Sequence, residues 1–415
     1  MSWMDVLPGS CRRFIVLAAG GLVCLNPHSI TTAGTGSAVT MESASAAESV
    51  DLFPQKAHLR YAGCFSIEYQ GTCKRIKVFN PQHHSEDPFV FVLVARGHAP
   101  PSDLPRGAVV VPIPLERIAV FSITWTALFP MLNIEETLVG LAGCEWVSTP
   151  EVVSLIRQGR ITEFGDGGQG MNRQIDMERL TLLRPDAVMV YGTGIPQFDR
   201  HPKLLEAGFK PLINLSHMES TPLGRTEWIK FIAAFFNKEA EAERVFDDIA
   251  RRYEALAERV RGVSRRPTVF CSTAWRGTWY MPGGGSYTAR FLEDAGADYL
   301  WRQDSRPGAI PLAIEAVIDR ARDAEFWIDT GLCRSLAELR GIDDRNGLFS
   351  AFREGKVFNN DARVNAEGGN DFWETGFARP DLVLADLISI FHPELLPDHR
   401  RIWYRQLPAR SEEER

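Results

Sequence analysis

The most regular pattern of apolar and polar positions lies in the middle of the chain, between Lys238 and Arg261. Apolar residues recur there at intervals of three or four, the spacing that places them on one face of an α-helix. They are Ala242, Val245, Phe246, Ile249, Tyr253, Leu256 and Val260. Asn237 can cap the first turn, and Gly262 can adopt the left-handed conformation that ends a helix. The pattern predicts one helix over residues 238–261, about 36 Å long.

A weak internal repeat flanks this helix. Glu178 and Glu315 each open a short amphipathic stretch, which leads after the same interval to Asp-Ala and then to an apolar run. A helix, a turn and a buried strand in this order form the returning half of a βαβ unit. The two flanks are therefore expected to be built alike, with the helix as a strut between two lobes. The alternative from local pattern is a long surface helix within a single domain.

The remaining pattern divides the chain into segments of different character. Residues 65–111 contain four short runs of β-forming residues, whereas strands and helices alternate from Ile118 onward. Such alternation predicts parallel sheets covered by helices on both faces, so the expected fold class is α/β. The expected organisation is a leader at 1–46, a strand-rich N-terminal extension at 47–112, a first lobe at 113–237, the connecting helix at 238–262, a second lobe at 263–407 and a tail at 408–415.

The composition narrows the class of partners. The chain is 45% hydrophobic and 24% charged, which is ordinary for a globular protein, and 415 residues favour two domains. The net charge is −7, with acids and bases interspersed along the chain. Nucleic acid is therefore not an expected partner.

The first residues are typical of an export signal. The pair Arg12-Arg13 precedes an apolar run over 14–25, which is too short to span a membrane stably. Small residues follow, with candidate cleavage sites at 36–38 and 44–46, and Cys24 is a candidate for lipidation. No later segment is apolar enough to cross a bilayer. The sequence predicts export to the periplasm or another extracytoplasmic compartment; a disordered cytosolic tail is the alternative.

Cysteine spacing leaves the redox state open. Five cysteines follow the leader, and only Cys64 and Cys73 are close in sequence. They flank a predicted hairpin with the turn signal Gln70-Gly71, and a two-residue turn there would place Cys73 opposite Glu68 rather than Cys64. Both a disulfide and two free thiols are compatible with this pattern.

Motifs of common enzyme families are missing from the sequence: there is no GxSxG, HExxH or P-loop, and no GxGxxG after a strand. The glycine-rich stretch 165–170 is predicted to be a flexible loop. His83-His84 is expected to be solvated, with metal binding as the alternative, and the other histidines show no ligand spacing. Neither a metal site nor a resident cofactor is expected.

Aromatic residues in loop-like sequence are the strongest sign of a binding site. The richest stretch, 275–287, combines large rings with proline and three consecutive glycines and is predicted to be a loop. Rings at strand ends can hold a flat or bulky ligand, and arginine can pair with its carboxylates. Packing within a hydrophobic core is the alternative for each tryptophan. The candidate ligand-binding residues are Trp125, Trp146, Trp275, Arg276, Trp279, Tyr287, Arg306 and Trp373.

From Arg117 to the C-terminus the chain resembles the bacterial substrate-binding proteins of ABC importers for iron–siderophores and cobalamin. The resemblance depends on several stretches in a fixed order, not on a single motif. These are LERIAV at 115–120, QGMN at 169–172, ERL at 178–180 with LRPD at 183–186, the connecting helix, the unit that begins at Glu315, and PDL to HP at 380–393.

The resemblance implies two Rossmann-like lobes joined by one rigid helix, with the ligand held between them. It adds Met171 and Asn172 to the candidate ligand contacts. It also implies one surface glutamate on each lobe, Glu178 and Glu315, that docks onto arginines of the importer's permease dimer. The extension at 47–112 departs from the family, because the family core does not need it.

The expected function is that of an exported, monomeric, non-enzymatic protein that delivers an iron chelate or a corrinoid to an ABC importer. Siderophore and corrinoid both stay open, because each calls for rings and a few polar groups. Haem is the alternative ligand, with Tyr280 or Tyr287 as candidate iron ligands. A tetrapyrrole chelatase-like enzyme on the same architecture and a sensor domain are the alternative classes.

We expect the mature chain to begin between about residues 35 and 50, because signal peptidase cleaves after small residues that follow an apolar run. N-terminal sequencing of protein from its own host measures this directly. A chain that starts at Met1 and stays in the cytosol would contradict export.

Overall fold

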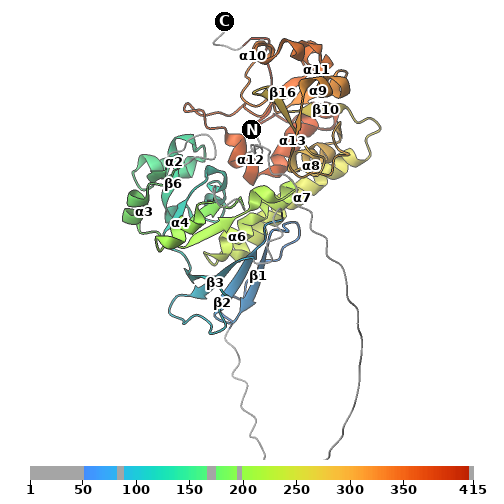
Figure 1. The fold of residues 1–415 in the computed structure, drawn as a ribbon. Helices are drawn as coiled ribbons and strands as arrows, with labels where there is room; N and C mark the ends of the chain where they lie inside the picture. The colour runs from blue at the N-terminus through green and yellow to red at the C-terminus, as the bar shows by residue number, and fades with distance from the viewer. Residues whose placement is uncertain (1–50, 82–87, 166–173, 194–198, 411–415) are drawn as a thin grey trace, which may run out of the picture.

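The computed structural model describes residues 51–81, 88–165, 174–193 and 199–410. In this part of the chain the strands form four sheets, two of which are the mainly parallel sheets of two lobes (Figure 1). The α/β fold class is confirmed. The predicted leader, His83-His84, most of the glycine-rich stretch and the candidates Met171 and Asn172 lie outside the described residues.

The N-terminal extension is a four-stranded sheet in the order β1-β2-β3-β4, in which only the β3–β4 pair is parallel. Ile76 and Val78 lie on the face that joins the main core, because residues two apart in a strand share a face. Cys73 and Val92 lie on the other face, in a smaller apolar cluster. The strands are β1 (Phe65–Gln70), β2 (Cys73–Val78), β3 (Phe89–Ala95) and β4 (Val109–Ile113).

The first hairpin differs from the expectation by one residue. Gly71 and Thr72 form its turn, so Cys73 lies opposite Gln70 instead of Glu68. Gly71 has a φ of 54°, a left-handed conformation that glycine adopts without strain. Cys64 and Cys73 are both free thiols.

The first lobe is a five-stranded parallel sheet in the order β7-β6-β5-β8-β9. Its central strands are apolar throughout, as expected of strands that are buried on both faces. The strands are β5 (Ile118–Val120), β6 (Leu138–Ala142), β7 (Thr162–Gly165), β8 (Ala187–Tyr191) and β9 (Pro211–Asn214). The helices are α1 (Leu128–Met131), α2 (Pro150–Arg157), α3 (Met177–Leu183), α4 (His201–Glu206), α5 (Pro222–Thr226) and α6 (Trp228–Ala234).

The second lobe has a sheet in the order β13-β10-β15-β16-β17, parallel except for β17. The strands are β10 (Thr268–Cys271), β13 (Asp298–Tyr299), β15 (Phe326–Ile328), β16 (Val357–Asn359) and β17 (Arg405–Gln406). The helices are α8 (Tyr287–Asp294), α9 (Ile314–Ala321), α10 (Leu336–Ile342), α11 (Ser350–Arg353), α12 (Thr375–Ala378) and α13 (Pro380–Phe391).

The aromatic stretch predicted to be a loop is largely strand, so that prediction was wrong. β11 (Ala274–Trp275) and β12 (Thr278–Pro282) form a hairpin, and β12 also pairs with β14 (Ala309–Leu312). The three glycines that follow are packed closely. A Cβ atom at Gly283 would lie 2.2 Å from the carbonyl oxygen of Arg306, and one at Gly284 would lie 2.3 Å from that of Arg302. These glycines are needed because another backbone segment lies directly against them.

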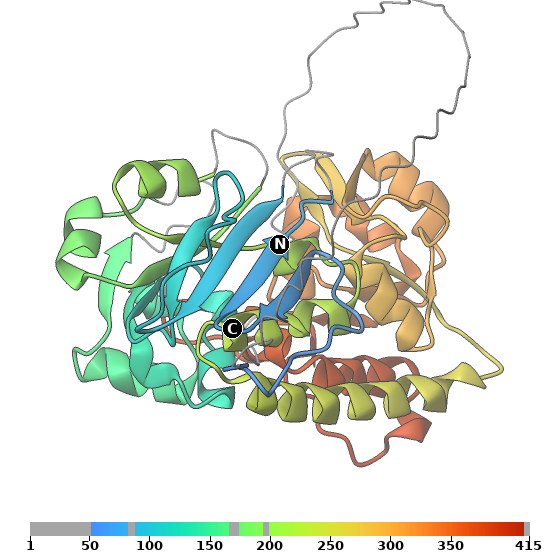
Figure 2. The same ribbon diagram turned by 90° about the horizontal axis from the view of Figure 1, so that it is seen from below.

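The predicted long helix is present as α7 (Glu239–Arg261), and it joins the two lobes (Figures 1 and 2). Its buried stripe includes Ala242, Phe246 and Ile249, as the apolar spacing predicted. Figure 2 shows α7 along one side of the molecule, with α13 beside its C-terminal part. The interpretation as a strut is therefore confirmed, and the single-domain alternative is wrong.

Both predicted caps of this helix were wrong. The cap residue is Lys238, and the side-chain oxygen of Asn237 accepts a hydrogen bond from Lys74 Nζ instead of from the first turn. Gly262 has a φ of −92°, so the helix ends without a left-handed residue. Thr149 is the N-cap residue of α2, but its hydroxyl donates to Glu374 and makes no capping hydrogen bond to the first turn. A side chain with a tertiary partner is not available for the local bond that its sequence position suggests.

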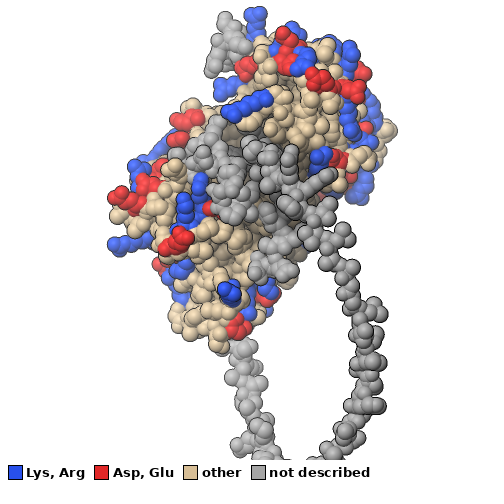
Figure 3. All heavy atoms as spheres, in the orientation of Figure 1, with Lys and Arg blue, Asp and Glu red and all other residues tan. Residues whose placement is uncertain are grey.

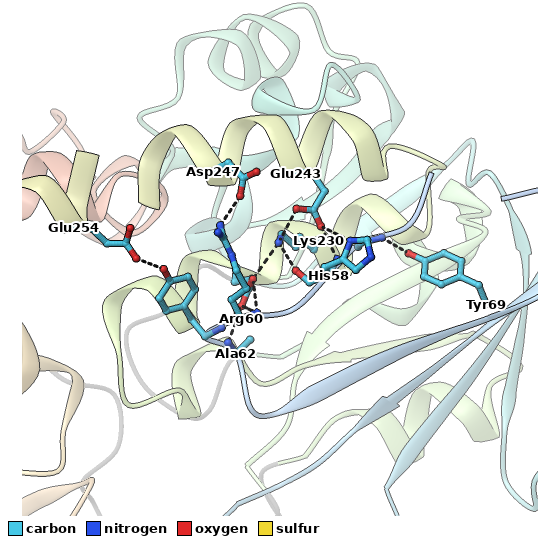
Figure 4. A network of polar contacts seen from close by, with 11 residues as sticks. His58, Arg60, Ala62, Tyr69, Lys230, Glu243, Asp247 and Glu254 are labelled. Carbon is cyan, nitrogen blue, oxygen red and sulfur yellow. Dashed lines mark hydrogen bonds and ion pairs between the residues drawn. The ribbon is translucent and has the colours of Figure 1, made fainter. Parts of the chain in front are cut away.

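A coil segment at residues 57–64 ties the extension to α6 and α7 (Figure 4). The carboxylate of Glu227, fully buried, accepts the backbone N–H groups of Arg60, Tyr61 and Ala62. Lys230, also fully buried, donates to Glu227 at 3.1 Å and lies 3.0 Å from Glu243 of α7. The buried charges are thus paired and hydrogen-bonded, which buried charges require.

A second buried ion pair holds strand β2 to the start of α7. Lys74 pairs with Glu239, and Lys74 has no exposed surface. Its ammonium also donates to the carbonyl of Ala234 at the end of α6, at 2.8 Å. Desolvation lowers the pKa of Lys74 and raises that of Glu239, so each charge depends on the other.

We expect Lys74→Met to lower the free energy of unfolding by about 3–5 kcal/mol, because Glu239 would be left as an unpaired buried charge. Adding Glu239→Leu should recover much of the loss. Lys77→Met, on the same strand, is the control, since Lys77 and Glu68 form an exposed pair worth at most about 1 kcal/mol. Urea titration of the four proteins measures these differences. If Lys74→Met and Lys77→Met lowered the free energy of unfolding equally, the Lys74–Glu239 pair would not hold β2 to α7 as described.

Candidate functional site

Polar and aromatic side chains gather where the carboxyl ends of strands in the two lobes approach each other. Tyr191 ends β8, and His217 follows β9; their rings lie 6.5 Å apart in an edge-to-face arrangement. In the second lobe, Asp329 follows β15 directly, and Asn360 follows β16. Ligands of open α/β sheets bind outside the carboxyl ends of the strands, which makes this boundary the candidate ligand site.

Arg225 of α5 and Tyr287 of α8 connect the two lobes at this boundary. The guanidinium carbon of Arg225 lies 3.8 Å from the centre of the Tyr287 ring, close enough for a cation–π contact. The carbonyl oxygens of His217 and Glu219 accept hydrogen bonds from the same guanidinium, at 2.9 and 3.0 Å. Arg225 is therefore held in a fixed orientation at the lobe boundary.

Burial shifts the pKa values of Arg225, Tyr287 and His217. Desolvation raises the pKa of Tyr287 to about 12 and lowers that of Arg225 to about 10. Desolvation, with the nearby Arg225 charge, lowers the pKa of His217 to about 4. At neutral pH the first lobe thus presents a cation and a neutral imidazole, and the second presents a neutral phenol.

Asp329 brings an acidic group to the second-lobe side. Its Oδ1 accepts hydrogen bonds from the Tyr404 hydroxyl at 2.9 Å and from Asn360 Nδ2 at 3.1 Å. Desolvation raises the pKa of Asp329 to about 6. Among the described residues, no group of three or more His, Cys, Asp or Glu side chains could hold a metal ion.

An arm of the second lobe, residues 361–378, crosses to the first lobe. The fully buried carboxylate of Glu374 accepts hydrogen bonds from the Thr126 and Thr149 hydroxyls and from the backbone N–H groups of Ser148 and Thr149. These four donors all belong to the first lobe. Desolvation raises the pKa of Glu374, and the hydrogen bonds oppose that shift. The arm therefore latches the lobes together beside the candidate site.

The tip of the arm approaches the first-lobe backbone closely. Asn365 Nδ2 donates to the carbonyl of Glu145 at 2.9 Å. A Cβ atom at Gly369 would lie 2.2 Å from the carbonyl oxygen of Trp146, so only glycine fits there. Further along the arm, the Thr226 hydroxyl of α5 donates to the carbonyl of Phe377 at 3.0 Å.

Two of the predicted ligand-binding tryptophans lie in the core, so those assignments are corrected. Trp279 has no exposed surface; its ring packs among Phe270, Trp327 and Phe349, and its indole N–H donates to the Cys271 carbonyl at 2.9 Å. Trp125 is 3% exposed, and its indole N–H donates to Ser216 Oγ at 3.1 Å. A ring sealed by its neighbours cannot touch a ligand without rearrangement of the core.

The other predicted residues keep some exposure and stay predictions. Trp275 is half-buried at the end of β11, with the guanidinium of the exposed Arg276 4.4 Å from its ring centre. Trp146 is half-buried beside the arm, and Trp373 is half-buried on the arm, where it packs edge-to-face on Phe372. Arg306 is 56% exposed and pairs with Asp304.

The structure places Glu178 and Glu315 in equivalent positions, as the internal repeat predicted. Each is the second residue of its helix, α3 and α9 respectively, and each is exposed. Glu315 pairs with Arg345, whereas Glu178 makes no ion pair with any residue that the structure describes. A carboxylate in the first turn is favoured by the helix dipole in either case.

Five residues that the fold brings to this boundary were not predicted from the sequence: Tyr191, His217, Arg225, Asp329 and Tyr404. A usable signal was present for Asp329, which follows the apolar run of the second repeat unit directly and therefore had to lie at a strand's carboxyl end. Arg225 and Tyr404 gave no such signal. Figure 3 shows positive and negative side chains close together on this view of the molecule, without a continuous basic area.

We expect Glu374→Gln to lower the free energy of unfolding by about 1–3 kcal/mol, because the amide group of glutamine would face a backbone donor. Glu367→Gln, at an exposed position on the same arm, should have little effect. Urea titration measures stability, and small-angle X-ray scattering detects any separation of the lobes. Equal stability of the two variants would mean that Glu374 does not latch the lobes.

Similar proteins of known structure share this fold. Helicobacter pylori CeuE with Ni(II) bound has a TM-score of 0.53 at 18% identity, over 70% of this chain and 88% of that one. A periplasmic heme-binding protein from Pseudomonas aeruginosa has a TM-score of 0.52 at 18% identity, over 72% of this chain and 99% of that one. These likenesses confirm the two-lobed architecture.

The amino-acid sequence is also similar to known proteins. An uncharacterized lipoprotein of Methanocaldococcus jannaschii is 26% identical over 297 residues, which are 69% of this chain and 67% of the relative. The model of the periplasmic binding protein family matches residues 158–364, which include the connecting helix and both repeat units. The prediction of a binding protein rather than an enzyme is thereby confirmed, and the chelatase-like alternative is set aside. With the fold and the family model in agreement, residues 158–364 of this chain match the periplasmic binding protein family.

Proposed function

We propose that this protein is exported, captures an iron–siderophore or a corrinoid between its two lobes, and delivers it to an ABC importer. One contact carries the proposal: the guanidinium carbon of Arg225 lies 3.8 Å from the centre of the Tyr287 ring. This contact joins the two lobes at the carboxyl ends of their strands. Rings and fixed charges from both sides can enclose a bulky chelate, and Arg225 can pair with its carboxylates. The half-buried Trp146 and Trp373, both at the arm that crosses between the lobes, supply further rings, and the half-buried Trp275 is a further candidate.

Export is supported by the family and by the lipoprotein relative. Within the described residues, no helix combines the length and the apolar character that a membrane crossing needs.

Haem is less well supported as the ligand. The sequence suggested Tyr287 or Tyr280 as the iron ligand, and coordination requires the phenolate form. The pKa of Tyr287 is raised to about 12, and its ring face is covered by Arg225. Tyr280 is half-buried on the opposite face of β12 from the core residue Trp279.

Docking onto the permease is assigned to Glu178 and Glu315, one on each lobe. The Glu315–Arg345 pair is exposed, with side chains 71% and 46% accessible, so water screens it and it contributes little stability. An arginine of the permease could replace Arg345 at small cost. Charge-assisted pairs of this kind steer association and fix orientation.

We expect protein purified from its own host to carry a bound iron chelate or corrinoid. Native mass spectrometry gives the mass of the ligand, and elemental analysis distinguishes iron from cobalt. A ligand that contains neither metal would contradict the proposed ligand class, and the family assignment would stand.

We expect Glu178→Ala combined with Glu315→Ala to abolish uptake while ligand affinity stays within about twofold. Stability should fall by about 0.3–1 kcal/mol for each glutamate, since each is a favourable first-turn residue. Glu151→Ala combined with Glu354→Ala is the control, with one exposed glutamate removed from each lobe. Transport assays with the matching importer measure uptake. A parallel fall in affinity and uptake would place the two carboxylates in the ligand site.

A further inference from the structure

Asp329 occupies a strained position at the centre of the second-lobe side of the boundary. It is the first residue after β15, and its φ is 57°, in the left-handed region that residues other than glycine seldom adopt. Ser272, at the end of the neighbouring β10, has a φ of 68°. Such strain persists only where the surroundings impose it, and it concentrates at functional sites.

The groups that hold the Asp329 carboxylate are neutral. Tyr404 and Asn360 both donate to Oδ1, and no Lys, Arg or His among the described residues forms an ion pair with Asp329. Tyr404 is 3% exposed and Asn360 is 6% exposed, whereas Asp329 itself is half-buried. A carboxylate with fixed neutral donors behind it, and with no ion-pair partner in the part of the chain that the structure describes, can accept a cation from outside.

Unpaired hydroxyls lie in the same turns. The Oγ1 atoms of Thr273 and Thr330 are buried and have no hydrogen-bond partner in the described structure. Thr330 follows Asp329, and Thr273 follows the strained Ser272. Buried polar groups are nearly always paired, so unpaired groups beside a strained carboxylate indicate a place where a polar partner is missing.

The two sides of the boundary therefore differ in charge. Arg225 presents a fixed cation from the first lobe, and Asp329 presents a carboxylate from the second, with the Tyr287 ring in contact with Arg225. We propose that Asp329 binds a cationic group of the ligand, an ammonium or a positively charged metal chelate, and so selects ligands that carry a positive charge on the second-lobe side. This inference rests on the proposed function, because it names the charge of the ligand that the same site would take.

The pH dependence of ligand binding can report on the charge of Asp329, because the surrounding groups do not titrate in the same pH range. The pKa of Asp329 is raised to about 6, whereas that of His217 is lowered to about 4 and that of Tyr287 is raised to about 12. The pKa values of Cys271 and Tyr404 are raised well above their usual range, and that of Arg225 is about 10. Between pH 5 and pH 8, Asp329 is thus the member of this group that changes charge. A cationic ligand should bind better above pH 6, where the carboxylate is ionised.

Asp329→Asn tests the charge with little disturbance of the fold. The asparagine oxygen can accept the same two hydrogen bonds, and asparagine tolerates the left-handed conformation better than most residues. Asp323→Asn is the matched control, because Asp323 is an exposed aspartate that precedes the amino end of the same strand. Thermal unfolding should show that both variants remain folded.

Two pairs of probes differ mainly in charge. One pair is a ferric trihydroxamate with a terminal ammonium group and its N-acetylated form; the other is aquocobalamin and cyanocobalamin. Quenching of tryptophan fluorescence at pH 7.5 and pH 5 gives the affinities. We expect the wild type and Asp323→Asn to bind the cationic member of at least one pair at least tenfold more tightly at pH 7.5. That preference should shrink at pH 5 and should be lost in Asp329→Asn at both pH values.

The outcomes separate this inference from the proposed function. Wild-type protein that binds both members of a pair equally, or an Asp329→Asn variant that keeps the preference, would overturn the inference and leave the proposed function standing. Wild-type protein that binds no member of either pair would overturn the proposed function, and the inference with it.

Discussion

The relative position of the two lobes depends on how the ends of α7 are held, because one helix makes the main connection between them. At its start, Glu239 is bound by the buried Lys74, which also binds the last turn of α6. Toward its end, the Tyr253 hydroxyl donates to Asp294 of α8 at 2.8 Å. Removal of one partner of a buried pair is costly, so the helix cannot turn freely in either lobe. The extension thereby acquires a structural role, since Lys74 belongs to its second strand.

The arm at 361–378 adds a second constraint between the two lobes. Its Glu374 accepts four hydrogen bonds from the first lobe, while Asn370 on the same arm donates to Asn360, which in turn donates to Asp329. A displacement of the arm would therefore shift Asp329 through the side chains of Asn370 and Asn360. A strut and a latch together define the spacing between Arg225 and Asp329 more closely than either could alone, and a ligand that contacts both residues depends on that spacing.

Local patterns predicted the elements well and the site poorly, for a physical reason. The helical period of α7 and the repeat around Glu178 and Glu315 are properties of neighbouring residues, so the sequence displays them directly. Asp329 is oriented by Asn360 and Tyr404, which are distant in sequence, and no local spacing encodes those partners. Trp279 was misassigned because the glycines after it resemble a loop, whereas the fold needs them for close backbone packing beneath a buried ring.

The charges at the boundary explain why an aromatic pattern alone was an incomplete guide. Rings bind many flat or bulky ligands with little discrimination, whereas a buried charge rejects any ligand that leaves it unpaired. Arg225 already has two carbonyl acceptors and the Tyr287 ring, so a neutral ligand leaves it satisfied. The described residues that donate to Asp329 are all neutral, so its ionised form gains most from a ligand. Discrimination between ligands of similar size should therefore arise on the second-lobe side, where the protein itself supplies no counter-charge among its described residues.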